Sequence, residues 1–266
     1  MATRLQIVGG GKMGEALLSG LLAADWAPAD ELAVVEKVAA RRDELSRSHP
    51  AVRLLSAPED ADGVLLAVKP NDAADACGAV AEAGCRRVLS IIAGVAIATL
   101  EAALGGDPPV AVVRAMPNTP ALVGAGAAAV APGTAADDTD LDWAEGILTA
   151  VGQVVRVPEK LLDAVTGLSG SGPAYVFLVA EALIEAGVLA GLSRDISRTL
   201  ATQTLLGAAR LLTETGEPAE ALRAAVTSPG GTTAAGLHAL ERAGVRAAFL
   251  DAVAAATARS KQLGGG

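Results

Sequence analysis

The amino-acid sequence predicts an α/β domain with a mainly parallel, doubly wound sheet, followed by an all-α domain. Short apolar runs alternate with helical stretches of about ten residues as far as Pro158, the pattern of βαβ units. After Pro158 the alternation stops and only helical patterns follow. A glycine-rich turn directly follows the first apolar run. We therefore expect two domains, residues 1–158 and residues 159–266.

The strands of the first domain are predicted from apolar runs bounded by Gly, Pro or polar residues. The run at residues 87–92 is largely apolar, as expected for a strand that is covered on both faces. The predicted strands are residues 5–8, 32–35, 52–55, 63–68, 87–92, 110–115, 127–131 and 153–157. The predicted helices between them are residues 15–24, 39–47, 71–83, 96–104 and 137–150.

The helices of the second domain are predicted from their apolar spacing and from the residues that end them. Ser193 suits an N-cap, Pro218 suits a first turn, and Gly216 suits a helix end. Between Tyr175 and Leu212 the patterns are apolar over wide arcs, so we expect burial against a second copy of the chain. The predicted helices are residues 161–167, 173–190, 194–213, 218–226, 233–243 and 245–263.

The composition argues against several classes of protein. With 21 Lys and Arg against 30 Asp and Glu, the net charge is −9, whereas a nucleic-acid partner would need a basic face that neutralises its phosphates. Aromatic residues make up 2% of the chain, too few for a base-stacking platform. Two cysteines, Cys77 and Cys85, are too few for a disulfide framework and lack CxxC spacing, so a zinc site of the usual Cys/His kind is not expected. We expect no nucleic-acid partner and no metal.

Two uncharged stretches raise the question of a membrane span. Residues 115–136 contain three prolines and three glycines, which suits loops and short strands. Residues 164–180 form a run shorter than the ~20 residues that a span needs. The first residues also lack the pattern of a secretory signal. We therefore expect a cytoplasmic protein without a membrane partner.

The segment Gly9-Gly10-Gly11-Lys12-Met13-Gly14 is a G-x-G-x-x-G motif between a predicted strand and a predicted helix. In such a motif Gly9 permits the tight turn, Gly11 lets the backbone approach a pyrophosphate, and Gly14 lets helix and strand pack closely. Glu36 ends the second predicted strand, where a carboxylate takes ribose hydroxyls. This context predicts a dinucleotide-binding Rossmann domain; a plain strand-to-helix turn is the alternative.

The choice between NADH and NADPH stays open at this point. The Glu36 carboxylate disfavours a 2′-phosphate, whereas the neighbouring cations Lys37, Arg41 and Arg42 can hold one. Lys69 ends the fourth predicted strand, and the carboxyl ends of parallel strands face the ligand crevice. An ordinary surface lysine is the alternative there. We expect NADPH or NADH as the cofactor.

Three further segments are rich in groups that bind small polar molecules. Residues 168–175 and 227–233 each precede a predicted helix and offer backbone N–H groups and hydroxyls without a charge. Such helix starts bind small anions, for example a carboxylate. Simple N-capping is the alternative for each loop. Asn118, in the proline-stiffened turn of residues 114–120, can bond a carboxamide.

Together these segments resemble the pyrroline-5-carboxylate reductase family over nearly the whole chain. The matching blocks are residues 9–14, 67–70, 93–95, 116–120, 169–175 and 225–233. The last block reads Ala-Val-Thr-Ser-Pro-Gly-Gly-Thr-Thr and is highly specific. The resemblance implies a Rossmann domain and a helical dimerisation domain, assembled as a homodimer or a dimer-based decamer.

The resemblance also implies a reaction, namely hydride transfer from NAD(P)H to the imine of 1-pyrroline-5-carboxylate, giving L-proline as the last step of proline biosynthesis. Its implied cofactor-binding residues are Gly9, Gly11, Lys12, Met13, Gly14, Ala67, Val68, Lys69, Pro70, Ala93, Gly94 and Asn118, to which the end of the second strand adds Glu36 and Lys37. Its implied substrate-binding residues are Ser228, Gly230, Gly231, Thr232 and Thr233. Thr233 would be the catalytic residue, in contact with the imine nitrogen. A protonated imine is already electrophilic, so no metal is needed.

Two alternatives rank lower. A β-hydroxyacid dehydrogenase also opens with this motif and ends in helices, but it needs a lysine in the helical domain. Here that half contains only Lys160 and Lys261, at its two ends. A non-catalytic NAD(P)-sensing scaffold would not need two loops rich in hydroxyl groups. The sequence therefore favours an oxidoreductase that acts on a cyclic imine.

Overall fold

The computed structural model describes residues 3–264 and divides into two compact units. The first unit comprises Met1–Ser171 with Ala255–Gly266, and the second comprises Gly172–Ala254. The predicted domains, residues 1–158 and 159–266, mark where the strand–helix alternation ends, and that boundary stays a prediction. The first unit extends further because the short helix α6, Leu162–Val165, packs against the sheet.

The first unit contains an eight-stranded sheet with the strand order β3-β2-β1-β4-β5-β6-β7-β8. Every neighbouring pair is parallel except β6 and β7, so the prediction of a mainly parallel sheet is confirmed. The order reverses between β1 and β4, and ligands bind at such a switch point. The strands are β1 Leu5–Val8, β2 Leu32–Val35, β3 Arg53–Leu55, β4 Val64–Leu66, β5 Arg87–Ser90, β6 Ala111–Met116, β7 Gly126–Pro132 and β8 Gly152–Arg156.

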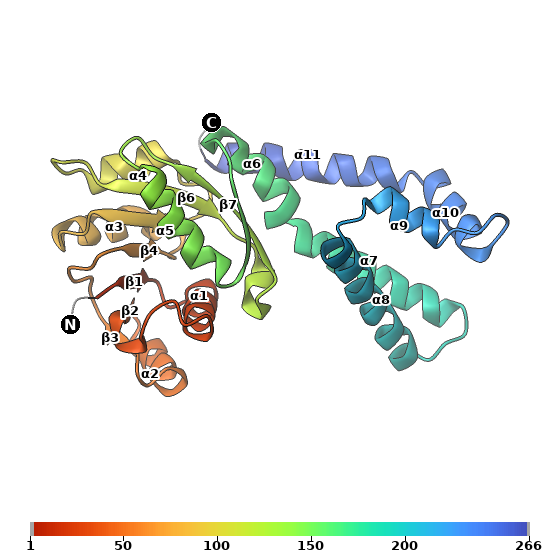
Figure 1. Ribbon diagram of the computed structural model, residues 1–266, viewed down its shortest axis with the longest axis horizontal. Coiled ribbons are helices and arrows are strands. Elements are labelled where there is room, and N and C mark those ends of the chain that lie inside the picture. Colours follow the sequence, from red (N-terminus) through yellow and green to blue (C-terminus); the bar gives the residue numbers. More distant parts are fainter. Residues whose placement is uncertain (1–2, 265–266) are drawn as a thin grey trace. The chain divides into compact units, whose positions relative to one another are not determined.

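Helices cover both faces of this sheet (Figure 1). Adjacent strand residues point to opposite faces, so Ile7 packs with α1, α2 and α5 while Val8 packs with α3 and α4. Burial on both faces explains why the strands read as apolar runs. The helices are α1 Lys12–Ala23, α2 Ala39–Ser48, α3 Ala73–Glu82, α4 Ile97–Leu104 and α5 Asp138–Thr149.

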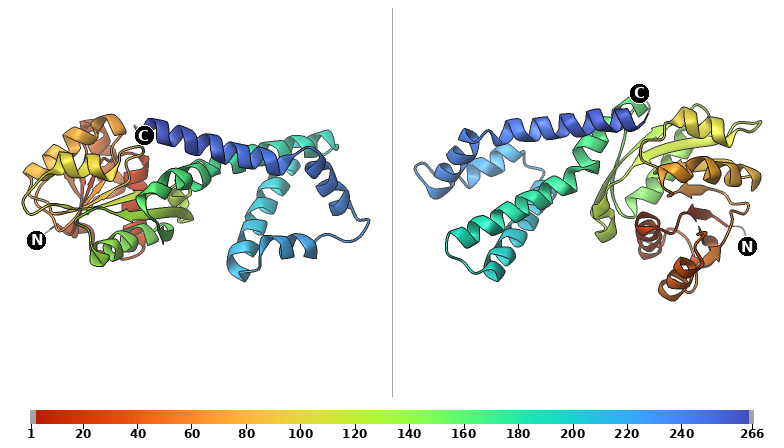
Figure 2. Two further views of the ribbon diagram at one scale, coloured as in Figure 1. Left: turned by 90° about the horizontal axis from the view of Figure 1, so that it is seen from above. Right: turned by 180° about the vertical axis from the view of Figure 1, so that it is seen from behind.

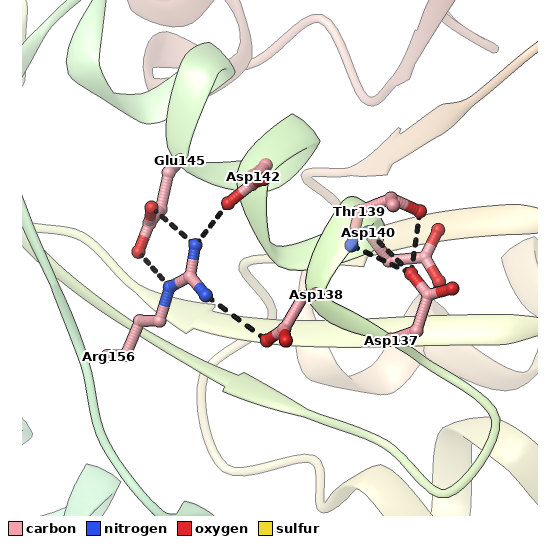
Figure 3. Close-up of polar contacts among 7 residues, drawn as sticks. All are labelled: Asp137, Asp138, Thr139, Asp140, Asp142, Glu145 and Arg156. Atoms are coloured by element: carbon pink, nitrogen blue, oxygen red, sulfur yellow. Dashed lines mark hydrogen bonds and ion pairs between the residues drawn. The ribbon is translucent and has the colours of Figure 1, made fainter.

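The edge strand β8 is tied to α5 by a cluster of charges (Figure 3). Arg156 on β8 forms ion pairs with Asp138, Asp142 and Glu145 of α5, with 2.7 Å between its Nε and Glu145 Oε1. Hydrogen bonds to Glu145 and Asp142 raise the pKa of Arg156. The cluster is exposed and far from the carboxyl ends of β1 and β4 in the strand order, so its role is structural.

The second unit consists of helices whose ends lie close to the predicted positions. The N-cap Ser193 accepts a hydrogen bond from Ile196 N, and Gly216 ends α8 in the left-handed conformation. The helices α7 and α8 lie side by side as a hairpin (Figure 2). The helices are α7 Gly172–Leu189, α8 Arg194–Thr215, α9 Ala219–Ala225 and α10 Thr232–Arg242, and α11 Val245–Leu263 begins here and ends in the first unit.

The helices of the second unit leave many large apolar side chains uncovered. No residue of α7 or α10 is buried, and in α8 only Ser197 and Ala201 are. Phe177 is 63% exposed and Leu189 is 91% exposed. Large apolar side chains exposed in such numbers indicate a contact with another molecule.

One helix in the described part of the chain is long and apolar enough to cross a membrane. The continuous helical run Glu159–Leu189 has 31 residues with a mean hydropathy of 1.5, and none of its apolar window is buried. The expectation that residues 164–180 are too short for a span is therefore wrong, because the helix that contains them is longer than this uncharged run. The predicted helix break at residues 168–172 is replaced by a π-helical turn, Thr166–Gly170, that joins α6 to α7.

Candidate active site

The glycine loop after β1 packs so closely that no side chain fits at two of its positions. Gly9 has a φ of +111°, and a Cβ there would lie 2.6 Å from the Ala67 carbonyl oxygen. A Cβ at Gly14 would lie 2.1 Å from the Gly9 carbonyl oxygen. The loop thus turns sharply against β4, and α1 packs directly on it.

Gly11 differs from these two glycines. It is the N-cap of α1, with a φ of −71° and no side-chain cap hydrogen bond. A Cβ at Gly11 would meet nothing within 4 Å. The open space lies at a helix N-terminus, where backbone N–H groups and the helix dipole favour a phosphate. The residues present therefore fit the pyrophosphate of a dinucleotide.

A cleft of about 480 Å³ runs from this loop along the carboxyl ends of β1, β2 and β4. Seven residues predicted to bind the cofactor line it, namely Gly9, Gly11, Glu36, Lys37, Ala67, Val68 and Lys69. Sequence reasoning missed Ser56, Ala57 and Pro58, which also line the cleft. They follow β3, and the rule that ligands bind at the carboxyl ends of parallel strands is the signal that points to them.

Glu36 holds the glycine loop in place. Its Oε2 accepts a hydrogen bond from Gly10 N at 3.0 Å, and its Oε1 accepts one from Val38 N at 2.9 Å. The carbonyl group of the same residue, Gly10, accepts a hydrogen bond from Arg41 Nε at 2.8 Å. Hydrogen bonds to Glu44 and Glu15 raise the pKa of Arg41.

The cations beside Glu36 are therefore not equivalent. Arg42 donates to the carbonyls of Glu36 and Lys37, at 2.6 and 3.0 Å, and so closes the end of β2. Arg42 is therefore already engaged by the protein backbone. Lys37 is exposed and lines the cleft. Of the three cations, Lys37 is the one whose side chain is free to reach a phosphate without breaking a hydrogen bond found in the described structure.

The other predicted cofactor residues lie outside the cleft lining but at the same edge of the sheet. They are Lys12 and Met13 at the start of α1, Gly14 behind them, Pro70 after β4, Ala93 and Gly94 after β5, and Asn118 after β6. Gly94 has a φ of +75° in its turn. Each follows the carboxyl end of a parallel strand, the edge that faces ligands in open α/β sheets.

The predicted substrate loop lies in the second unit, at the start of α10. Gly230 has a φ of +69°, and Gly231 N donates to the Ser228 carbonyl at 3.0 Å. Gly231 is the N-cap of α10 and provides no side-chain cap hydrogen bond. Thr232 and Thr233 are the first two residues of the helix, with Thr233 half-buried. The loop therefore presents backbone N–H groups and hydroxyls that suit a small carboxylate.

In the described part of the chain, neither histidine lies in the glycine loop or in the loop before α10. Among residues 3–264, no group of three His, Cys, Asp or Glu side chains could hold a metal ion. His238 is exposed on α10, and His49 Nε2 lies 3.5 Å from Ser19 Oγ. The two loops themselves offer backbone N–H groups at helix starts, which suit binding of small anionic groups.

The sheet order, the glycine loop and the helical second unit together define a dinucleotide-binding oxidoreductase with a separate helical unit. Residues 159–263 match the family model for pyrroline-5-carboxylate reductase dimerisation, and residues 4–94 match that for the coenzyme F420-dependent NADP oxidoreductase domain. This chain belongs to the pyrroline-5-carboxylate reductase family. The resemblance noted in the sequence and the predicted fold class are thereby confirmed.

Individual relatives match along their whole length. The pyrroline-5-carboxylate reductase of Synechocystis sp. is 47% identical over 99% of both chains. Among solved structures, the enzyme of Coxiella burnetii is 35% identical with a TM-score of 0.92, covering 99% of both chains. The Plasmodium falciparum enzyme, whose structure has NADP bound, is 31% identical with a TM-score of 0.85, covering 98% of both chains.

Proposed function

We propose that this chain reduces the imine of 1-pyrroline-5-carboxylate with NADPH or NADH and so forms L-proline, the last step of proline biosynthesis. The observation that carries the proposal is the intact loop of residues 225–233, which ends at a helix start without a side-chain cap. Such a helix start binds a carboxylate without an arginine. The full-length match to reductases of this family supports the same activity.

The dinucleotide is assigned to the cleft at the carboxyl ends of β1, β2 and β4. When bound, NAD(P)H supplies the hydride that reduces the C=N bond. Gly9, Gly11 and Gly14 shape the loop for the pyrophosphate, and Glu36 and Lys37 lie where the adenosine ribose is expected. Lys69, exposed in the segment after β4, is assigned to a phosphate or a ribose.

The substrate is assigned to the start of α10. Ser228, Gly230, Gly231 and Thr232 provide hydroxyl and N–H donors for the carboxylate of the five-membered ring. The Thr233 hydroxyl is assigned to the imine nitrogen, where a neutral group is better than a lysine because the nitrogen is positively charged when protonated. Hydride transfer needs the imine carbon ~3–3.5 Å from the nicotinamide carbon, so positioning is the main catalytic contribution of the protein.

The test of this proposal is a steady-state assay of the purified full chain. Oxidation of NADPH or NADH is followed by absorbance with 1-pyrroline-5-carboxylate as the second substrate, and proline is identified as the product. Saturable turnover on this imine supports the proposal. Turnover on a 3-hydroxy acid in place of the imine, or cofactor binding without any turnover, would replace it with one of the two alternatives named above.

The apolar faces of α7 and α8 are assigned to self-association, because the family model that covers them describes dimerisation. We expect a cytoplasmic homodimer, alone or as the unit of a decamer, with no membrane or nucleic-acid partner. The apolar window of Glu159–Leu189 then contacts protein rather than lipid. Light scattering without detergent should give at least the dimer mass at micromolar concentration. A stable, active monomer, or a need for detergent to stay in solution, would contradict this assignment.

Glu36→Gln is expected to shift the cofactor preference toward NADPH. The change removes a negative charge beside the expected 2′-phosphate. It also removes one of the two hydrogen bonds that Glu36 accepts, from Gly10 N and Val38 N, because the NH2 group of glutamine cannot accept. The ratio of the two dissociation constants should change about tenfold, corresponding to ~1.4 kcal/mol. Fluorescence titration with each cofactor measures this ratio without turnover.

The matched control for this prediction is Glu31→Gln. Glu31 directly precedes β2, so it lies at the opposite end of the strand that Glu36 follows. It carries the same charge and should leave the ratio unchanged. If both variants shift the ratio equally, the effect comes from net charge, and Glu36 does not lie beside the ribose.

A further inference from the structure

The carbonyl group of Ser169 lacks the donor that a regular helix would supply. Ser169 lies in the π-helical turn Thr166–Gly170 between α6 and α7. In an α-helix a carbonyl accepts a hydrogen bond from the N–H four residues later. Four residues after Ser169 stands Pro173, which has no N–H. The sequence thus removes the regular α-helical partner of this carbonyl.

The side chain of Asn118 provides a donor for it. Asn118 Nδ2 donates to the Ser169 carbonyl at 3.0 Å, and Asn118 Oδ1 accepts from Ala127 N at 2.9 Å. Asn118 is only 9% exposed. One buried amide therefore connects the turn after β6, the start of β7 and the π-helical turn. Both hydrogen bonds are partly buried, and loss of either leaves a polar group without this partner.

The packing around this amide fits the same connection. A Cβ at Gly170 would lie 2.8 Å from Met116 Cε, so the end of β6 lies directly against the π-helical turn. The hydroxyls of the turn bond to their own helix, with Ser169 Oγ donating to Val165 O and Thr166 Oγ1 donating to Leu162 O. Asn118 adds a hydrogen bond that reaches this turn from the segment after β6.

The geometry points to Asn118 as a positioning residue for hydride transfer, which acts by fixing the Ser169 carbonyl and with it the turn Thr166–Gly170 to the cofactor edge of the sheet. This inference rests on the proposed function. It differs from the sequence-based expectation of a direct bond to the cofactor carboxamide: each polar atom of the Asn118 side chain already has one protein partner, and the role inferred here acts through these two bonds. π-Helical turns are frequent at functional sites.

The first experiment is Asn118→Asp in the full-length enzyme. Asp keeps the acceptor for Ala127 N but replaces the donor by an oxygen that faces the Ser169 carbonyl oxygen. We expect kcat to fall about ten- to thirtyfold, while the dissociation constant of NADPH changes less than about threefold. Hydrogen exchange should rise in peptides covering residues 166–172 and stay unchanged at Ala127.

The second experiment supplies the missing donor from the other side. Pro173→Ala restores an N–H four residues after Ser169. If Asn118 acts through this carbonyl, Asn118→Asp should cost at least about threefold less in kcat in the Pro173→Ala background than in the wild type. Asn71→Asp, the same chemical change at an exposed position after β4, is the control and should leave kcat and exchange at residues 166–172 unchanged.

The outcomes separate this inference from the proposed function. A wild-type enzyme without turnover on the imine overturns the proposed function. An active wild type with an Asn118→Asp variant of normal kcat overturns only the inference. A loss of NADPH affinity as large as the loss of kcat/KM also overturns it, because that result indicates direct contact with the cofactor. If the effects of Asn118→Asp and Pro173→Ala on kcat are additive, Asn118 does not act through the Ser169 carbonyl. If Asn118→Asp unfolds, Asn118→Ser replaces it. Its effects on kcat and on hydrogen exchange are then compared between the wild-type and the Pro173→Ala background.

Discussion

Gly11→Val is expected to weaken NAD(P)H binding by at least about a hundredfold while the protein stays folded. Gly11 has an ordinary φ of −71°, and its Cβ would meet nothing within 4 Å, so the fold tolerates a side chain there. The valine side chain would instead fill the space at the N-terminus of α1, where the pyrophosphate is expected. Isothermal titration with NADPH, together with the melting temperature of the variant, measures both parts of the prediction.

Two other glycines provide the controls. Gly78→Val places the same side chain in similarly open space on α3, outside the cleft lining, and should leave NADPH affinity unchanged. Gly14→Ala should instead destabilise the fold, because its Cβ would lie 2.1 Å from the Gly9 carbonyl oxygen. A folded Gly11→Val protein with wild-type affinity would show that the pyrophosphate does not lie at this loop.

Thr233→Ala is expected to lower kcat about ten- to hundredfold and to leave NADPH affinity nearly unchanged. The hydroxyl is assigned to the imine nitrogen, and a contact that orients the reacting group acts on the hydride-transfer step. Thr233→Ser should recover much of the loss because the hydroxyl remains. Single-turnover kinetics at saturating NADPH measure the step itself rather than product release.

The structure sharpens the alternative for Thr233, a role in capping the helix. Gly231, not Thr233, is the N-cap of α10, so Thr233 stands at the second helical residue. Loss of its hydroxyl should therefore leave the melting temperature within about two degrees of wild type. Thr215→Ala is the control, because the Thr215 hydroxyl donates to the Leu211 carbonyl inside α8. A Thr233→Ala enzyme with full kcat would show that the catalytic assignment is wrong.

Local sequence predicted most of the fold because each signal involves neighbouring residues. Strand β2, predicted over residues 32–35, is found at Leu32–Val35, since a strand buried on both faces needs consecutive apolar residues. The start of α8 was predicted from Ser193, whose hydroxyl caps the helix from three residues away. The turn at Gly9 was predicted because only glycine readily adopts a φ of +111° without strain.

The structure was needed where the decisive partner lies far along the chain. The antiparallel pairing of β7 with β6 depends on how the chain returns to the sheet, and the apolar pattern of β7 is the same in either direction. The π-helical turn Thr166–Gly170 was predicted as a break, because glycine and proline reduce helix propensity whether or not tertiary contacts compensate.

By itself the sequence determined that a glycine loop follows the first strand, that an acid ends the second, and that a hydroxyl-rich loop precedes α10. These features depend on residue type at a fixed spacing along one strand–loop–helix unit. Only the tertiary structure decided that Glu36 bonds to Gly10, and that Asn118 bonds to Ser169, 51 positions away in the chain. A hydrogen bond depends on direction and on distances of about 3 Å, and these are set only when separate elements have packed together.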